Sequence, residues 1–113
     1  MKIGTVYWIT GLAGSGKTTL GKRLYEQLRL TNNAVVFLDG DNLREVFGHE
    51  QGHTLAERKH LAMKYSRLCQ MLSEQGIDVV CATISLFKEI HEFNRQHLQK
   101  YCEIFVKCTM EEL

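Results

Sequence analysis

The sequence of 113 residues lacks an excess of charge, a long apolar run and proline. It has 14 basic and 13 acidic residues, so its formal net charge of +1 creates no large field that would attract nucleic acid. Its longest apolar stretch is a handful of residues around 79–82, far short of the roughly 20 that a membrane-spanning helix needs. We therefore expect neither nucleic-acid binding nor a membrane span. No internal repeat, linker or low-complexity segment occurs, and the length fits one domain.

Cysteine is sparse, and no two cysteines form a C-x-x-C pair. They lie far apart along the chain, which makes a metal site and a disulfide framework poor interpretations. We therefore expect reduced, buried thiols in a cytoplasmic protein. Residues 1–4 run directly into the first expected strand, which leaves no room for a signal peptide and favours the same location. The four cysteines are Cys69, Cys81, Cys102 and Cys108.

The sequence does contain a P-loop pattern at residues 11–18, Gly-Leu-Ala-Gly-Ser-Gly-Lys-Thr. Glycines let successive backbone N–H groups turn inward around a polyphosphate, and a following helix adds the partial positive charge of its N-terminus. In such a loop Lys17 reaches the β- and γ-phosphates of ATP, and the hydroxyl of Thr18 ligates Mg²⁺. The predicted ATP-binding residues are Gly11, Leu12, Ala13, Gly14, Ser15, Gly16, Lys17, Thr18 and Thr19.

Other interpretations of this segment are weaker. A glycine-rich turn that happens to carry a lysine would match the four fixed positions in roughly one chain in several hundred of this length. A dinucleotide-binding loop requires Gly-x-Gly-x-x-Gly, which glycines at 11, 14 and 16 do not make. A GTPase is disfavoured because no Asn-Lys-x-Asp signature occurs in the sequence.

Strand-like and helix-like segments alternate along the chain. Apolar runs, typical of parallel strands buried on both faces, predict strands at residues 5–10, 34–38, 78–84 and 104–108. Helices are predicted directly after the P-loop and at residues 43–47, 54–76 and 86–100. This order predicts an α/β fold, a three-layer α/β/α sandwich around a parallel sheet.

Apolar stripes predict which helix faces are buried. Leu20, Leu24 and Leu28 recur at helical spacing after the P-loop and are expected to pack on the sheet. A capping box, Thr54 to Glu57, marks the start of the long helix. The expected buried stripe of that helix consists of Leu61, Tyr65, Leu68 and Leu72.

Two carboxylates, Asp39 and Asp41, follow the second strand in the block Asp-Gly-Asp-Asn. The same composition is common in turns, which is the structural alternative. Ligands of open α/β sheets bind beyond the carboxyl ends of the strands, so both side chains are expected on the P-loop side. There one carboxylate can accept the proton of an attacking hydroxyl, and the other can hold the water shell of the metal. The third strand leads to Ser85 rather than to an aspartate, which favours a small-molecule kinase over a motor or a switch GTPase.

Three segments resemble the adenylylsulfate (APS) kinases: residues 11–19, Leu-Asp-Gly-Asp-Asn-Leu-Arg at 38–44, and Ile-Ser at 84–85. The resemblance covers nearly the whole chain. It implies that ATP, with Mg²⁺, phosphorylates a hydroxyl of a nucleotide acceptor, and that Lys17, Asp39, Asp41 and Ser85 are the catalytic candidates. Some family members are described with a phosphoserine at the position of Ser85, but no neighbouring base is evident here, so we interpret Ser85 as an acceptor contact. The implied acceptor site consists of Asp41, Asn42, Arg44, Arg58, Leu61, Ile84 and Ser85.

The sequence departs from the family pattern where the acceptor should bind. Leu61 stands where the family has an asparagine, and His53 where it stacks adenine on a phenylalanine. Phe87 replaces the tyrosine of the family's Ile-Ser-Pro-Tyr segment, which accounts for part of the missing proline. The phosphate-binding residues are kept while the acceptor wall is changed. The alternative to APS is therefore another acceptor, cytidine diphosphoramidate of surface-polysaccharide synthesis.

The resemblance also implies further structure, since family members continue past the fourth strand into an arginine-bearing lid, a fifth strand and a last helix. We therefore expect these 113 residues to bind nucleotide but to transfer phosphate poorly, and to self-associate as a homodimer through an open sheet edge. A non-enzymatic ATP-binding module remains an alternative, although such a module has no need of Asp39, Asp41 and Arg44.

Overall fold

The computed structural model describes residues 2–11, 15–47, 54–83 and 87–107 of the chain. Its strands coincide with runs of apolar, mostly β-branched or aromatic residues, and its helices with the amphipathic segments between them. In chain order the elements are β1 (Val6–Thr10), α1 (Lys17–Arg29), β2 (Val35–Asp39), α2 (Gly40–Phe47), α3 (Leu55–Glu74), β3 (Asp78–Thr83), α4 (Lys88–His97) and β4 (Tyr101–Phe105).

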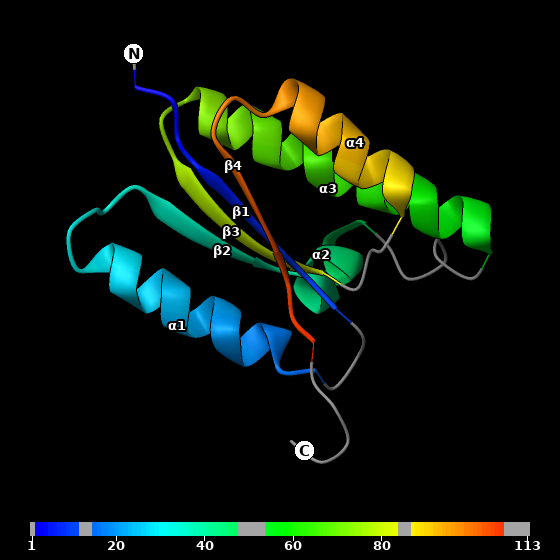
Figure 1. The fold of residues 1–113 in the computed structure, drawn as a ribbon, viewed down its shortest axis with the longest axis horizontal. Helices are drawn as coiled ribbons and strands as arrows, with labels where there is room; N and C mark the ends of the chain where they lie inside the picture. The colour runs from blue at the N-terminus through cyan, green and yellow to red at the C-terminus, as the bar shows by residue number, and fades with distance from the viewer. Residues whose placement is uncertain (1, 12–14, 48–53, 84–86, 108–113) are drawn as a thin grey trace.

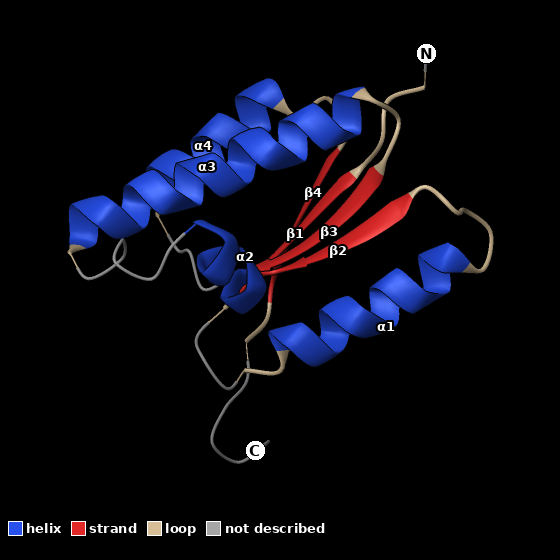
Figure 2. Cartoon of the chain, turned by 180° about the vertical axis from the view of Figure 1, so that it is seen from behind, coloured by secondary structure: helices blue, strands red, loops and turns tan. Residues whose placement is uncertain are grey.

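The four strands form one parallel sheet in the order β2-β3-β1-β4. Ala82 of β3 stands between Ile9 of β1 and Asp39 of β2, so the three strands end at the same edge. Helix α1 covers one face of the sheet, and α3 and α4 cover the other (Figure 1, Figure 2). The predicted three-layer α/β/α sandwich with a parallel sheet is confirmed.

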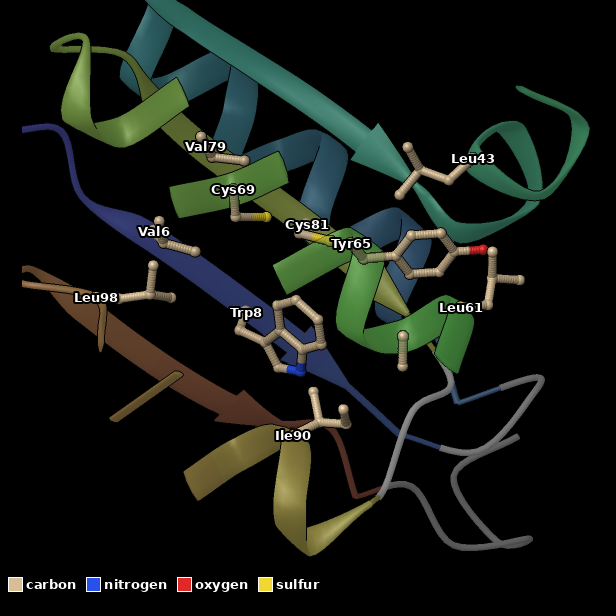
Figure 3. Close-up of a cluster of buried hydrophobic side chains, with 11 residues drawn as sticks. Val6, Trp8, Leu43, Leu61, Tyr65, Cys69, Val79, Cys81, Ile90 and Leu98 are labelled. Carbon is tan, nitrogen blue, oxygen red and sulfur yellow. The ribbon is translucent and has the colours of Figure 1, made fainter. Parts of the chain in front are cut away.

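The main core lies between the sheet and the pair α3 and α4. Val6 and Trp8 of β1 are fully buried there, against side chains of both helices (Figure 3). Complete burial of each such large side chain contributes about 1.5–3 kcal/mol to folding. The predicted stripe of α3 is present, with Leu61 and Tyr65 in the core and Leu68 and Leu72 packed against it.

The opposite face is covered by α1, which lies over β2 and β3. The expected stripe of Leu20, Leu24 and Leu28 is only partly correct, because Leu20 is 40% exposed. The most closely packed position is Gly21, where an added Cβ would lie 2.8 Å from the ring of Phe37. The helix backbone therefore approaches the sheet most closely at Gly21 and not at Leu20.

Several predicted boundaries were wrong. Helix α2 begins at Gly40 instead of 43, because Oδ1 of Asp39 accepts a hydrogen bond from the N–H of Asp41 at 2.8 Å and so starts the helix directly at the end of β2. Strand β4 spans Tyr101–Phe105 instead of 104–108. Helix α4 spans Lys88–His97, inside its predicted range of 86–100. The start of α3 was right: Thr54 Oγ1 accepts a hydrogen bond from the N–H of Glu57 at 3.1 Å.

The cysteines agree with the prediction in part. Cys69 and Cys81 are fully buried, and their mutual hydrogen bond, together with burial, raises the pKa of the Cys81 thiol. Cys102 is exposed, which corrects the expectation. Cys102 belongs to β4 and pairs with Tyr7 of β1. Both side chains lie on the face of the sheet that α1 covers, but α1 packs over β2 and β3, away from β4. Cys108 lies outside the described residues.

No helix in the described ranges combines the length and the apolar character needed to cross a membrane.

Candidate active site

The phosphate end of the candidate site is the N-terminus of α1. Gly16 precedes the helix in the left-handed region, with φ 91° and ψ 11°. Within the described residues no side chain caps α1 and none in its first turn is acidic, whereas the first turns of α2, α3 and α4 carry Asp41, Glu57 and Glu89. No acidic side chain of the described residues therefore neutralises the positive dipole end of α1, which favours binding of an external anion there.

The residues around this helix end form a close-packed cradle. A Cβ on Gly11 would lie 2.8 Å from the carbonyl oxygen of Val106 and 2.9 Å from Ser15 Oγ. Ser15 Oγ is buried and has no hydrogen-bond partner in the part of the chain that is described. A buried hydroxyl in that state costs about 1–3 kcal/mol unless a ligand bonds it. Lys17 is 9% exposed in the first turn of α1.

Thr18 is half-buried and Thr19 is exposed, both in the first turn of α1. Leu12, Ala13 and Gly14 of the predicted ATP site lie outside the described residues.

Asp39 and Asp41 lie at the same sheet edge as the P-loop. Asp39 ends β2, and only β3 separates β2 from β1. Two strand spacings, about 10 Å, therefore lie between the ends of β2 and β1. Asp39 uses one carboxylate oxygen to cap α2, as its turn-like sequence suggested, and Asp41 is exposed in the first turn of that helix.

The predicted acceptor residues fall into three groups: exposed residues, a core residue, and residues outside the described ranges. Asn42 and Arg44 are exposed on α2, and Arg58 is exposed near the start of α3, which projects past the sheet on the side of α2 (Figure 1). Leu61 lies in the core and is 5% exposed, and its side chain carries no hydrogen-bonding group. Ile84 and Ser85 lie outside the described residues, as does His53.

Phe87, the residue that follows the segment 84–86, links α4 to α3. Lys59 Nζ lies 5.9 Å from the centre of the Phe87 ring and forms an ion pair with Glu89. Lys59 thus connects α3 to the start of α4 through Glu89 and Phe87.

Sequence reasoning placed Tyr65 in a buried stripe and missed its position beside the site. Its ring packs on Phe47 of α2, with centroids 5.9 Å apart. Burial raises the pKa of Tyr65 to about 12, and the nearby charge of Arg44 opposes this shift. Helical spacing was the signal that could have found it. Tyr65 lies one helical turn after Leu61, and Leu61 stands where the family pattern has an asparagine at the acceptor.

No group of three or more histidine, cysteine, aspartate or glutamate side chains is arranged to hold a metal among residues 2–11, 15–47, 54–83 and 87–107. The oxygen donors that the site does offer, Thr18 and the two aspartates, are of the type that Mg²⁺ prefers together with phosphate and water.

Comparisons with known proteins give a consistent result. A model of the adenylylsulphate kinase family matches residues 3–113. The cytidine diphosphoramidate kinase of Campylobacter jejuni subsp. jejuni serotype O:2 is 45% identical over 108 residues, which make up 96% of this chain and 63% of that protein. The adenylyl-sulfate kinase of Synechococcus sp. is 32% identical over 108 residues, 96% of this chain and 61% of that protein. This chain therefore spans less than two thirds of the length of either relative.

A solved structure has the same fold. The APS kinase of Mycobacterium tuberculosis in complex with AMPPNP and APS matches with a TM-score of 0.85 and 26% sequence identity, over 99% of this chain and 67% of that one.

Proposed function

The chain belongs to the adenylylsulphate kinase family, and on that premise we propose that it binds ATP with Mg²⁺ and directs the γ-phosphoryl group to a hydroxyl of a nucleotide acceptor. The observation that carries this proposal is the N-terminus of α1, which, among the described residues, has no side-chain cap and no acidic residue in its first turn. Ser15 and Lys17 lie beside it, one with a buried hydroxyl and the other nearly buried. A polyphosphate would place negative charge at the dipole end of α1 and beside Lys17, and it would give the Ser15 hydroxyl a hydrogen-bond partner.

The two aspartates are suited to different roles. The N–H of Asp41 already occupies Oδ1 of Asp39. The carboxylate of Asp41 is exposed beside Arg44, and we assign it to orient the acceptor hydroxyl and take its proton. Asp39 and Thr18 would hold the magnesium ion, Asp39 through its water shell. Bound Mg²⁺ supplies neutralisation of charge on the β- and γ-phosphate oxygens.

For the acceptor we propose a cytidine diphosphate derivative in place of APS. Identity is 45% to the cytidine diphosphoramidate kinase and 32% to the adenylyl-sulfate kinase. Leu61, at the position of the family's asparagine, is buried in the core and offers no hydrogen bond. A site that has lost such a bond loses discrimination for the group that made it.

The test is transfer of label from [γ-³²P]ATP to APS and to cytidine diphosphate derivatives, side by side and at high protein concentration. We expect labelled cytidine product in excess over labelled APS product. Efficient use of APS alone would contradict the choice of acceptor. Binding of ATP with transfer to neither would instead favour the non-enzymatic ATP-binding module. A cytoplasmic location fits the use of ATP and the buried thiols of Cys69 and Cys81.

A further inference from the structure

Tyr65 packs its ring in the core against α2, the helix that carries Asp41 and Arg44. The residue is 5% exposed, and its ring lies 5.9 Å from that of Phe47 on α2. Figure 3 shows the ring between Leu43 and Leu61, with the hydroxyl turned away from Val6 and Trp8. Contacts from the long helix and from α2 thus hold the hydroxyl in one place, so it costs little conformational entropy to use.

Charges of the acceptor side reach this hydroxyl. Burial is the main cause that raises the pKa of Tyr65 to about 12, the positive charge of Arg44 lowers it, and the negative charge of Asp41 raises it. Both charged residues belong to α2 and both are predicted acceptor contacts. At neutral pH the hydroxyl is protonated, so it can donate a hydrogen bond.

The other tyrosine with a half-buried hydroxyl provides a contrast. Tyr101 donates to Oε1 of Glu103 at 2.8 Å and accepts from Nδ2 of Asn94 at 3.3 Å, so its hydroxyl is used within the fold. The hydroxyl of Tyr65, in contrast, lies within range of the charges of Arg44 and Asp41 on α2.

We propose that Tyr65 is a specificity-determining residue of the acceptor site, where its hydroxyl donates a hydrogen bond to an oxygen of the acceptor nucleotide beside Asp41 and Arg44. This inference rests on the proposed function. It goes beyond the family's motif residues, because Tyr65 belongs to none of the segments that carry the resemblance. Leu61, one turn earlier on the same buried face of α3, carries no polar group, so Tyr65 supplies a hydrogen-bond donor on that face.

The experiment compares Tyr65→Phe with the unchanged chain by calorimetry, with ADP, cytidine diphosphate and APS as separate probes. Phenylalanine keeps the ring and its packing and removes only the hydroxyl. We expect the affinity for the acceptor that the unchanged chain binds to fall roughly 3- to 10-fold, as for loss of one hydrogen bond, with ADP affinity changed less than twofold. The control is Tyr101→Phe, which should leave both affinities within twofold.

A second measurement protects the test against a variant that does not fold. With ¹³Cζ-labelled tyrosine the four tyrosines give four signals, and the Tyr65 signal should move when the acceptor saturates the unchanged chain. Equal acceptor binding by Tyr65→Phe, or a Tyr65 signal that does not move, overturns the inference alone. If the unchanged chain binds ADP but neither cytidine diphosphate nor APS, the proposed function and this inference both fall.

Discussion

At the scale of single residues, Lys17 brings a second positive group to an already positive helix end. It is nearly buried in the first turn of α1, where the helix dipole also favours anions. We predict that Lys17→Ala lowers the affinity for ATP roughly 10- to 100-fold, the range for losing a hydrogen bond to a charged group. Isothermal titration of both proteins with ATP and Mg²⁺ measures the change.

The matched control for this prediction is Lys22→Ala, an exposed lysine on the same helix. It removes the same charge away from the N-terminus, so ATP affinity should stay within about twofold at moderate salt. Equal affinity of the Lys17→Ala protein and the unchanged chain would contradict the assignment of residues 11–18 as the phosphate site.

Two neighbouring residues show how far sequence reasoning reaches at this scale. Helical spacing predicted correctly that Leu61 and Tyr65 share the buried face of α3. Spacing alone could not predict that Tyr65 packs against α2, the helix that carries Asp41 and Arg44, because α2 and α3 are brought together by the long-range contact between Phe47 and Tyr65.

At the scale of elements, α4 and β4 are joined by a polar contact. Arg95 donates to Oε2 of Glu103 at 2.5 Å, and Tyr101 donates to Oε1 at 2.8 Å. Burial raises the pKa of Glu103, but these hydrogen bonds outweigh it and leave the pKa below its usual 4.5. The contact therefore stabilises the fold above pH 4.5 and is lost as the pH falls through the lowered pKa.

We predict that Glu103→Gln reduces the free energy of unfolding at pH 7, and that the difference from the unchanged chain shrinks as the pH is lowered below 4.5. Urea unfolding at a series of pH values measures it. Glu26→Gln, an exposed change on α1, controls for the loss of one negative charge. A difference that is the same at pH 7 and pH 3 would show that the substitution acts through packing and not through the ionised carboxylate.

The same polar contact explains why β4 was the least well predicted strand. An apolar run at 104–108 was the only signal, yet Tyr101 and Glu103 belong to the strand and use their polar groups toward α4. Buried inner strands such as β3 lack this mixture, and their apolar runs located them to within a residue. The early start of α2 was missed because Asp39 both ends a strand and caps a helix.

At the scale of the whole molecule, we predict that these 113 residues bind nucleotide but turn it over slowly. Charge spreads over the γ-phosphoryl oxygens during transfer, and an arginine that stabilises it can be worth roughly 10³–10⁵ in rate. Arg44 and Arg58 belong to the proposed acceptor site, and the family resemblance implies that a lid supplies an arginine for the γ-phosphoryl group. The rate of this chain is to be compared with that of a chimera, in which the part of the Campylobacter relative that this chain does not cover is fused to it. This chain covers 63% of that relative.

The expected result is equal ATP affinity for the two proteins and faster transfer by the chimera, measured with labelled ATP in single-turnover reactions. Equal rates would show that the arginines already present in this chain suffice, and the role given to a lid would be wrong.

The last prediction concerns β4, the outer strand of the sheet, which pairs with β1 and with no other strand of the described part. Its outer edge presents backbone N–H and C=O groups, beside an exposed Cys102 and a Phe105 that is 55% exposed. Such an edge is a template for pairing with a second chain. We expect a homodimer that forms with rising protein concentration and is detected by sedimentation equilibrium. Cys102→Lys, which sets like charges against each other across paired edges, should shift the protein to monomer, whereas Val46→Lys on α2, where Val46 is 76% exposed, should not. A protein that is monomeric at every concentration, or a dimer that persists in Cys102→Lys, would show that the β4 edge is not the contact.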